Sequence, residues 1–139
     1  MRGAGVKPDV VAGHSLGEYA AAHAAGSLDL DDGVHLVAER DRLMTEAAQK
    51  TPGGMVAVIG ADPEEVERAV GEADGIVVAA NFNTPHQTVV SGEREALEGG
   101  LEGIKGKKVP LRVAGAFHSP LMEGAEARME KLLAGVEFE

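Results

Sequence analysis

The sequence predicts an α/β protein with two parts, and two patterns carry this prediction. The apolar run 10–12 leads into Gly-His-Ser-Leu-Gly-Glu at 13–18 and then into an alanine-rich stretch that favours helix. This is the order strand, sharp turn, helix, with Ser15 at the tip of the turn. From residue 55 to residue 113, short apolar runs alternate with acidic stretches in the order β-α-β-β-α-β. That order is typical of a ferredoxin-like sheet with two helices on one face.

The turn around Ser15 has glycines at 13 and 17. So tight a turn holds the backbone of Ser15 in a strained conformation, and side chains at these two positions would obstruct it. We expect a strand over 8–12, a helix over 17–25 that ends at Gly26, and a second helix from about 31 to 48. A central parallel strand needs neighbours on both sides. The sequence around 8–12 contains no candidate for them.

In the β-α-β-β-α-β stretch we expect strands at 55–59, 76–81, 88–90 and 109–113, with helices that begin near Asp62 and Glu93. The second of these helices is weak, because each of three glycines within 98–103 costs about 1 kcal/mol relative to alanine. A turn at 81–85, a loop at 114–120 and an amphipathic helix at 121–133 complete the chain. The prediction is therefore a partial core formed by residues 1–53 and 114–139, and a small ferredoxin-like subdomain formed by residues 54–113.

Composition excludes several classes of protein. Thirteen basic and 23 acidic residues give a net charge of −10, which argues against binding to nucleic acid or to anionic membranes. The sequence has no cysteine, so disulfides, thiolate metal sites and cysteine nucleophiles are excluded. It also has no signal-peptide core and no apolar run that approaches the ~20 residues of a membrane span. We expect a soluble, cytoplasmic protein.

A serine hydroxyl needs a base to become a nucleophile, and the best of the five histidines is His118. It stands in a loop after a strand, between Phe117 and a stiff Ser-Pro pair. We expect none of the other four to be the base. His14 is next to Ser15, and neighbouring side chains on a turn diverge. His23 and His35 lie in predicted helices, and His86 lies in a polar turn. No orienting carboxylate is evident. Two readings stay open, a triad whose acid lies elsewhere or a dyad whose histidine is held by a backbone carbonyl.

Two further residues are candidates for binding. The backbone N–H of Leu16, directly after the serine at a helix N-terminus, is placed to stabilise an oxyanion. Arg40 lies on the apolar face of the second helix, where a cation needs a partner. That partner is either a carboxylate in a structural salt bridge or the carboxylate of a substrate held by a bidentate clamp.

Four motifs, at 13–19, 38–44, 81–85 and 116–122, resemble those of malonyl-CoA:acyl-carrier-protein transacylases and the acyltransferase domains of fatty acid and polyketide synthases. The resemblance implies an α/β-hydrolase-like core with an inserted ferredoxin-like subdomain. It implies that Ser15 is the nucleophile, that His118 is the general base and acid in a dyad, and that Arg40 binds the malonyl carboxylate. By the same resemblance, Phe117 before the histidine and Leu16 after the serine imply malonyl rather than methylmalonyl as the acyl group.

The implied reaction moves malonyl from malonyl-CoA to Ser15 and then to the phosphopantetheine thiol of acyl carrier protein, without a cofactor. Family members extend beyond both ends of this sequence, so we interpret it as an internal portion whose further partners are the missing N- and C-terminal parts. Two alternatives remain. One is a serine esterase, which has no need of a cation at Arg40, and the other is an inactive module that binds carrier protein or complements the rest of the enzyme.

Overall fold

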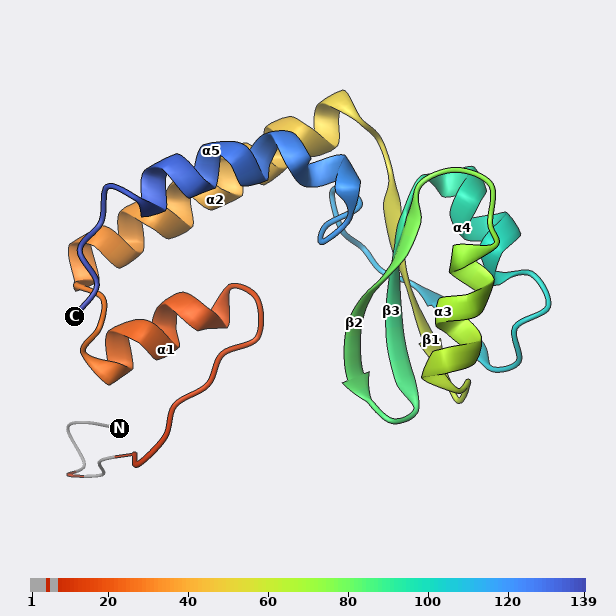
Figure 1. Cartoon of the computed structure of the whole chain (residues 1–139), viewed down its shortest axis with the longest axis horizontal. Coiled ribbons are helices and arrows are strands. Elements are labelled where there is room, and N and C mark those ends of the chain that lie inside the picture. The colour runs from red at the N-terminus through yellow and green to blue at the C-terminus, as the bar shows by residue number, and fades with distance from the viewer. Residues whose placement is uncertain (1–4, 6–7) are drawn as a thin grey trace. The chain divides into compact units, whose positions relative to one another are not determined.

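A computed structural model describes residue 5 and residues 8–139 as a mixed α/β protein (Figure 1). Its elements are α1 (Gly17–Ala25), α2 (Leu30–Lys50), β1 (Gly54–Ile59), α3 (Pro63–Gly71), β2 (Val77–Thr84), β3 (Gln87–Gly92), α4 (Arg94–Leu101), β4 (Lys107–Pro110), the 3₁₀ turn η2 (Pro120–Met122) and α5 (Glu123–Leu133). Packing divides the chain into two compact units. The first comprises residues up to Asp41 together with Met129–Glu139, and the second comprises Arg42–Arg128.

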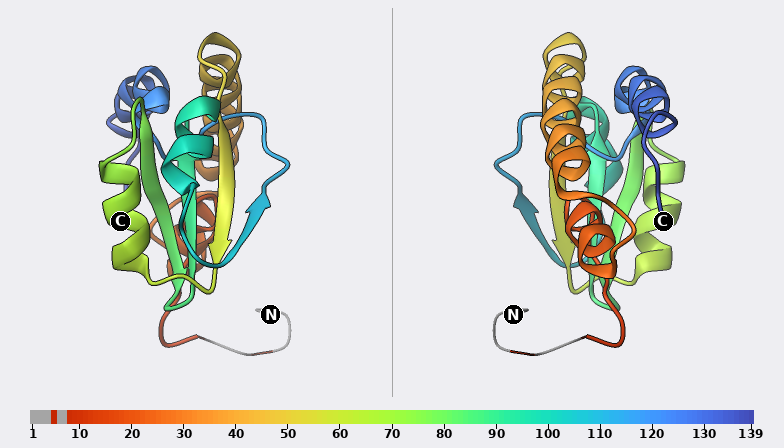
Figure 2. Two further views of the ribbon diagram at one scale, coloured as in Figure 1. Left: turned by 90° about the vertical axis from the view of Figure 1, so that its right-hand side faces the viewer. Right: turned by 90° about the vertical axis from the view of Figure 1, so that its left-hand side faces the viewer.

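The second unit contains a four-stranded sheet in the order β2-β3-β1-β4, with every neighbouring pair antiparallel. The elements follow one another in the predicted order β-α-β-β-α-β. Helices α3 and α4 lie on one side of this sheet (Figures 1 and 2). The core between helices and sheet includes Val58, Val66, Val90, Leu97 and Leu101, all at most 5% exposed.

Local signals explain the ends of these helices. The Asp62 side chain accepts a hydrogen bond of 2.9 Å from the Glu64 N–H, and Pro63 occupies the first helical position of α3, where its missing N–H costs nothing. Helix α4 has only eight residues, in line with the weak, glycine-rich helix expected there. In α1, Gly26 adopts the left-handed conformation that ends many helices.

Two predicted boundaries in the sheet are wrong. The expected turn at 81–85 mostly belongs to β2, which continues to Thr84, and only Pro85 and His86 form the turn. Register shifts between Ala79 and Asn81 and between Phe82 and Thr84 absorb the irregular sequence without ending the strand. The last strand covers 107–110 rather than 109–113, because its pairing with β1 begins at Lys107 opposite Ile59; beyond Pro110, one hydrogen bond of 2.9 Å from Leu111 N–H to Met55 O continues this pairing.

The face of the sheet opposite α3 and α4 carries a second, smaller cluster. Successive side chains of β1 point to opposite faces, so Met55 and Ala57 lie on this side while Val58 faces the helices. Val89 joins them, and the half-buried ring of Phe117 packs against the cluster. The segment that carries His118 is thereby attached to the sheet through its neighbouring residue.

An exposed ion-pair group links α2 to α5 within the second unit. Arg128 donates to Glu46 at 2.7 Å, and Arg42 donates to the same carboxylate. The Arg128 and Arg42 guanidinium groups lower the pKa of Glu46 below its usual range. Because the three side chains are 37% to 48% exposed, water screens this attraction and its contribution to stability is small.

The first unit shows the largest departure from the sequence prediction. The expected strand over 8–12 is absent, and Val10 is 85% exposed. A strand persists only when its N–H and C=O groups pair with a neighbouring strand, and the described part of this chain offers no such neighbour. Among the described residues, every helix is too short or too polar to cross a membrane.

Candidate active site

Ser15 sits in a tight turn at the start of α1. Its φ is 53°, in the left-handed region, and the turn is closed by hydrogen bonds from Gly17 N–H to His14 O (3.0 Å) and from Glu18 N–H to Ser15 O (3.1 Å). A Cβ at Gly13 would lie 2.1 Å from the carbonyl carbon and oxygen of Gly17, so only glycine fits there. A Cβ at Gly17 would meet nothing within 4 Å. The expected steric need for glycine therefore holds at position 13 and is wrong at position 17.

Arg40 lies directly beside this serine. Its Nη2 donates a hydrogen bond of 2.8 Å to Ser15 Oγ, although 25 residues separate the two in sequence. Both belong to the first unit, and α1 and α2 bring them together. Within the described ranges, the structure shows no ion pair between Arg40 and a carboxylate. A permanent cation is thus held next to the candidate nucleophile.

Leu16 precedes the first residue of α1. No side chain caps this helix end, and N–H groups at the start of a helix have no intrahelical acceptor. The helix dipole adds partial positive charge at the same place. The Leu16 side chain is 50% exposed, so what this residue offers the site is its backbone.

His118 belongs to the second unit and shares one rare property with Ser15. Among the described residues, these two are the only non-glycine residues with positive φ, 53° for Ser15 and 59° for His118. The left-handed conformation costs a residue with a Cβ about 1–2 kcal/mol. Such strain concentrates at active sites. The sequence analysis expected a strained backbone at Ser15, but it gave no such expectation for His118.

The loop around His118 contains a residue that the sequence reasoning missed as a functional candidate. Ser119 is only 9% exposed, and its hydroxyl donates to Ala116 O at 2.6 Å and accepts from Leu121 N–H at 3.3 Å. It caps the turn η2, with Pro120 in the first position. The Ser-Pro pair was the signal for this role, because serine before a proline is a common helix start.

Two of the other histidines have visible structural roles. His23 Nδ1 lies 3.0 Å from Leu28 O, within the first unit. His86 is exposed at the β2–β3 turn, where its N–H donates to Thr84 Oγ1 at 3.2 Å. Neither arrangement requires an acid–base function.

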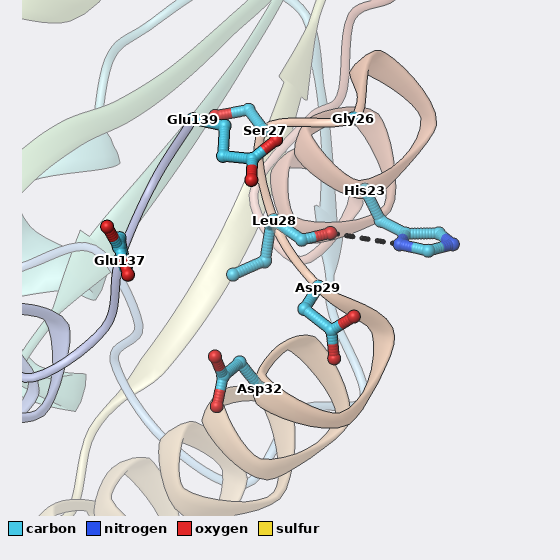
Figure 3. A pocket seen from close by; sticks show the side chains of 8 residues that line it. All are labelled: His23, Gly26, Ser27, Leu28, Asp29, Asp32, Glu137 and Glu139. Carbon is cyan, nitrogen blue, oxygen red and sulfur yellow. Dashed lines mark hydrogen bonds between the residues drawn. The ribbon is translucent and has the colours of Figure 1, made fainter.

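A hollow of about 350 Å³ in the first unit is lined by His23, Gly26, Ser27, Leu28, Asp29, Asp32, Glu137 and Glu139. Figure 3 shows the four carboxylates around it, with the hydrogen bond from His23 to the Leu28 carbonyl. This charge repels anionic ligands. Over the part of the chain that the structure describes, no group of three or more His, Asp or Glu side chains is arranged to hold a metal ion.

The structure thus places the Ser15 hydroxyl in a strained turn before a helix, with the Arg40 guanidinium 2.8 Å from it. The sequence matches the acyl transferase domain family over residues 1–137, and the chain belongs to that family.

Known relatives share this assignment. The polyketide biosynthesis malonyl CoA-acyl carrier protein transacylase BaeC of Bacillus velezensis is 44% identical over 140 residues, which cover 96% of this chain and 47% of the relative. The crystal structure of MCAT from Streptococcus pneumoniae is 43% identical with a TM-score of 0.92, over 99% of this chain and 47% of that one. The structure of a type II PKS acyl-carrier protein in complex with its malonyl-transacylase is 40% identical with a TM-score of 0.87, over 95% of this chain and 45% of that one. The chain spans about half the length of these relatives.

Proposed function

We propose that this chain carries the acyl-transfer residues of a malonyl-CoA:acyl-carrier-protein transacylase of fatty acid or polyketide biosynthesis. The observation that carries the proposal is the Arg40 guanidinium, 2.8 Å from the hydroxyl of a serine in a left-handed turn. Relatives that are 41% and 44% identical to this chain are named malonyl CoA-acyl carrier protein transacylases. One solved structure, 40% identical, is a malonyl-transacylase in complex with its acyl-carrier protein. Malonyl-CoA and acyl carrier protein are therefore the proposed substrates.

In the first half-reaction, Ser15 Oγ attacks the thioester carbonyl of malonyl-CoA while His118 takes the hydroxyl proton. The Leu16 N–H stabilises the oxyanion of the tetrahedral intermediate. The carbon–sulfur bond then breaks, and His118 returns the proton to the departing coenzyme A thiolate. In the second half-reaction, His118 takes the proton of the carrier protein's phosphopantetheine thiol as its sulfur attacks the malonyl-serine ester; the ester C–O bond then breaks, and His118 passes this proton to Ser15 Oγ. No cofactor enters either step.

Arg40 is proposed to bind the free carboxylate of the malonyl group. A guanidinium stays charged at every physiological pH and presents five N–H donors in a planar fork, so it can grip both carboxylate oxygens. Its contact of 2.8 Å with Ser15 Oγ keeps the guanidinium near the attacked carbonyl, and in a malonyl group the carboxylate is separated from that carbonyl by a single methylene. Phe117 is proposed to limit the space beside the α-carbon, which favours malonyl over its methylated analogue.

The fold proposal follows the same family. Residues 54–113 form a ferredoxin-like subdomain, supported by the element order β-α-β-β-α-β and the antiparallel sheet order β2-β3-β1-β4. Residues 1–53 and 114–139 form part of an α/β-hydrolase-like core, supported by the turn at Ser15. We also propose a cytoplasmic location, where coenzyme A thioesters and carrier proteins meet.

Intact-mass measurement after incubation with labelled malonyl-CoA tests this function. We expect a malonyl adduct on the unaltered chain and none on Ser15→Ala, because the substitution removes the attacking oxygen. The control is Ser27→Ala, a second serine of the first unit, which should label normally. Labelling of Ser15→Ala would show that another residue is the nucleophile. If the unaltered chain is folded and forms no adduct, only the inactive module that binds carrier protein or complements the rest of the enzyme remains.

Substitution of Arg40 separates acyl transfer from esterase activity. We expect Arg40→Ala to lower the rate of adduct formation with malonyl-CoA roughly 10- to 100-fold, the value of one hydrogen bond to a charged group. Labelling by acetyl-CoA, which has no free carboxylate, should fall much less. Arg40→Lys should recover part of the malonyl rate, since lysine restores charge without the planar fork. Equal losses with both thioesters would contradict a carboxylate clamp.

A further inference from the structure

The hydroxyl of Ser119 is buried next to His118 and has no part in the acyl-transfer steps. It joins two backbone groups on either side of His118, the carbonyl of Ala116 at 2.6 Å and the N–H of Leu121 at 3.3 Å. The Ser119 carbonyl in turn accepts from Met122 N–H at 2.9 Å. One side chain therefore closes the chain into a short loop with His118 inside it.

The residues before His118 are fixed by packing. A Cβ on Gly115 would lie 2.5 Å from the Cβ of Ala48 on α2, so the backbone runs in close contact with that helix. Ala116 is fully buried, and the Phe117 ring packs on the sheet beside Met55 and Ala57. The loop is anchored on this side by contacts that do not involve the Ser119 hydroxyl.

His118 lies between these anchors with φ of 59°, a conformation that a residue with a Cβ adopts only when its surroundings impose it. Packing fixes the backbone up to Phe117, but the left-handed residue comes after it. The hydrogen bonds of the Ser119 hydroxyl tie the chain on the far side of His118 to Ala116 and Leu121. Without them, the backbone at 118 could relax to negative φ and carry the imidazole to a different direction.

We propose that Ser119 is the positioning residue for His118: its hydroxyl bridge from Ala116 to Leu121 holds the histidine in the left-handed turn that presents the imidazole to its reaction. This inference rests on the proposed role of His118 as general base. A general base works only within hydrogen-bond reach of the proton that it takes, so a rotated backbone lowers the rate without removing any reacting group. Binding of malonyl-CoA should remain.

Nuclear magnetic resonance of the isotope-labelled chain tests the geometry without any need for turnover. A residue with positive φ gives a strong amide-to-Hα cross-peak within the residue, and we expect this signal for His118 in the unaltered chain. It should weaken in Ser119→Ala and return in Ser119→Thr, which restores a hydroxyl. The matched control is Ser91→Ala, which removes a buried hydroxyl that has no hydrogen-bond partner among the described residues. An unchanged His118 signal in Ser119→Ala would overturn the proposal.

Rates of adduct formation from malonyl-CoA distinguish failure of this inference from failure of the proposed function. We expect Ser119→Ala to lower the maximal rate roughly 10- to 100-fold with little change in the half-saturating concentration, and Ser119→Thr to restore most of it. His118→Ala serves as the reference. If His118→Ala is slow and Ser119→Ala is fast, the positioning role is wrong while the proposed function stands. If His118→Ala forms the adduct as fast as the unaltered chain, His118 is not the general base, and that part of the proposed function is wrong.

Discussion

Replacing His118 with alanine is expected to lower the rate of malonyl transfer to Ser15 by about 10²- to 10⁴-fold, the usual contribution of a positioned general base. The physical reason is that a serine hydroxyl is almost fully protonated at neutral pH, so its attack depends on a group that takes the proton as the new bond forms. Arg40, which donates a hydrogen bond to Ser15 Oγ, cannot take that role because a guanidinium has no acceptor.

The rate is measured as the growth of the malonyl adduct with time by intact mass, at saturating malonyl-CoA. The matched control is His86→Ala, since His86 is an exposed histidine in the β2–β3 turn. We expect this variant to label at the unaltered rate. A His118→Ala chain that keeps more than a tenth of the rate would assign the base to another group.

The features that the sequence predicted well are those set by local interactions. Gly26 ends α1 in the left-handed conformation, and Asp62 caps α3, because both effects act within one turn of the chain. The alternation of strands and helices between 54 and 110 is equally local, since each element shows its own apolar period. These signals sufficed to place Ser15 at the tip of a turn.

The features that were missed depend on partners far away in sequence. Residues 8–12 are apolar enough for a strand, but a strand needs hydrogen-bonded neighbours, and the described chain provides none. Conversely, β2 runs through a segment that looks like a turn, because pairing with β3 outweighs local preference. The contact of Arg40 with Ser15 was also beyond a sequence argument, since the sequence left open whether the cation faced a carboxylate or a substrate.

Backbone strain adds information that residue identity lacks. Serine and histidine are common residues, and the chain has five histidines. A positive φ at Ser15 and His118, and at no other non-glycine residue that the structure describes, marks these two positions independently of any motif. Each left-handed residue costs about 1–2 kcal/mol, so the fold sacrifices stability at both places. Strain of this kind is expected where geometry serves a reaction rather than stability.

Gly13 is where the turn at Ser15 depends most on one missing side chain. In Gly13→Ala, the new Cβ would lie 2.1 Å from two backbone atoms of Gly17 and 2.3 Å from the N of Glu18. Backbone atoms at the start of a helix cannot move aside like the end of a flexible side chain, so the turn itself must open. We expect the free energy of unfolding to fall by about 3 kcal/mol, the upper part of the usual range for overpacking. We also expect adduct formation at Ser15 to fall by about 10²-fold or more, because a shift of about 1 Å at the nucleophile has that effect.

Gly17→Ala is the matched control, at the other glycine of the same motif. A Cβ there meets nothing within 4 Å, and position 17 is the first residue of α1. Alanine favours helix over glycine by about 1 kcal/mol, so this variant should be as stable as the unaltered chain or more stable. Denaturant unfolding and the mass assay read out both variants. Equal behaviour of Gly13→Ala and Gly17→Ala would show that the turn tolerates a Cβ on either side of Ser15, and that its left-handed serine is not held by the close approach of residues 13 and 17.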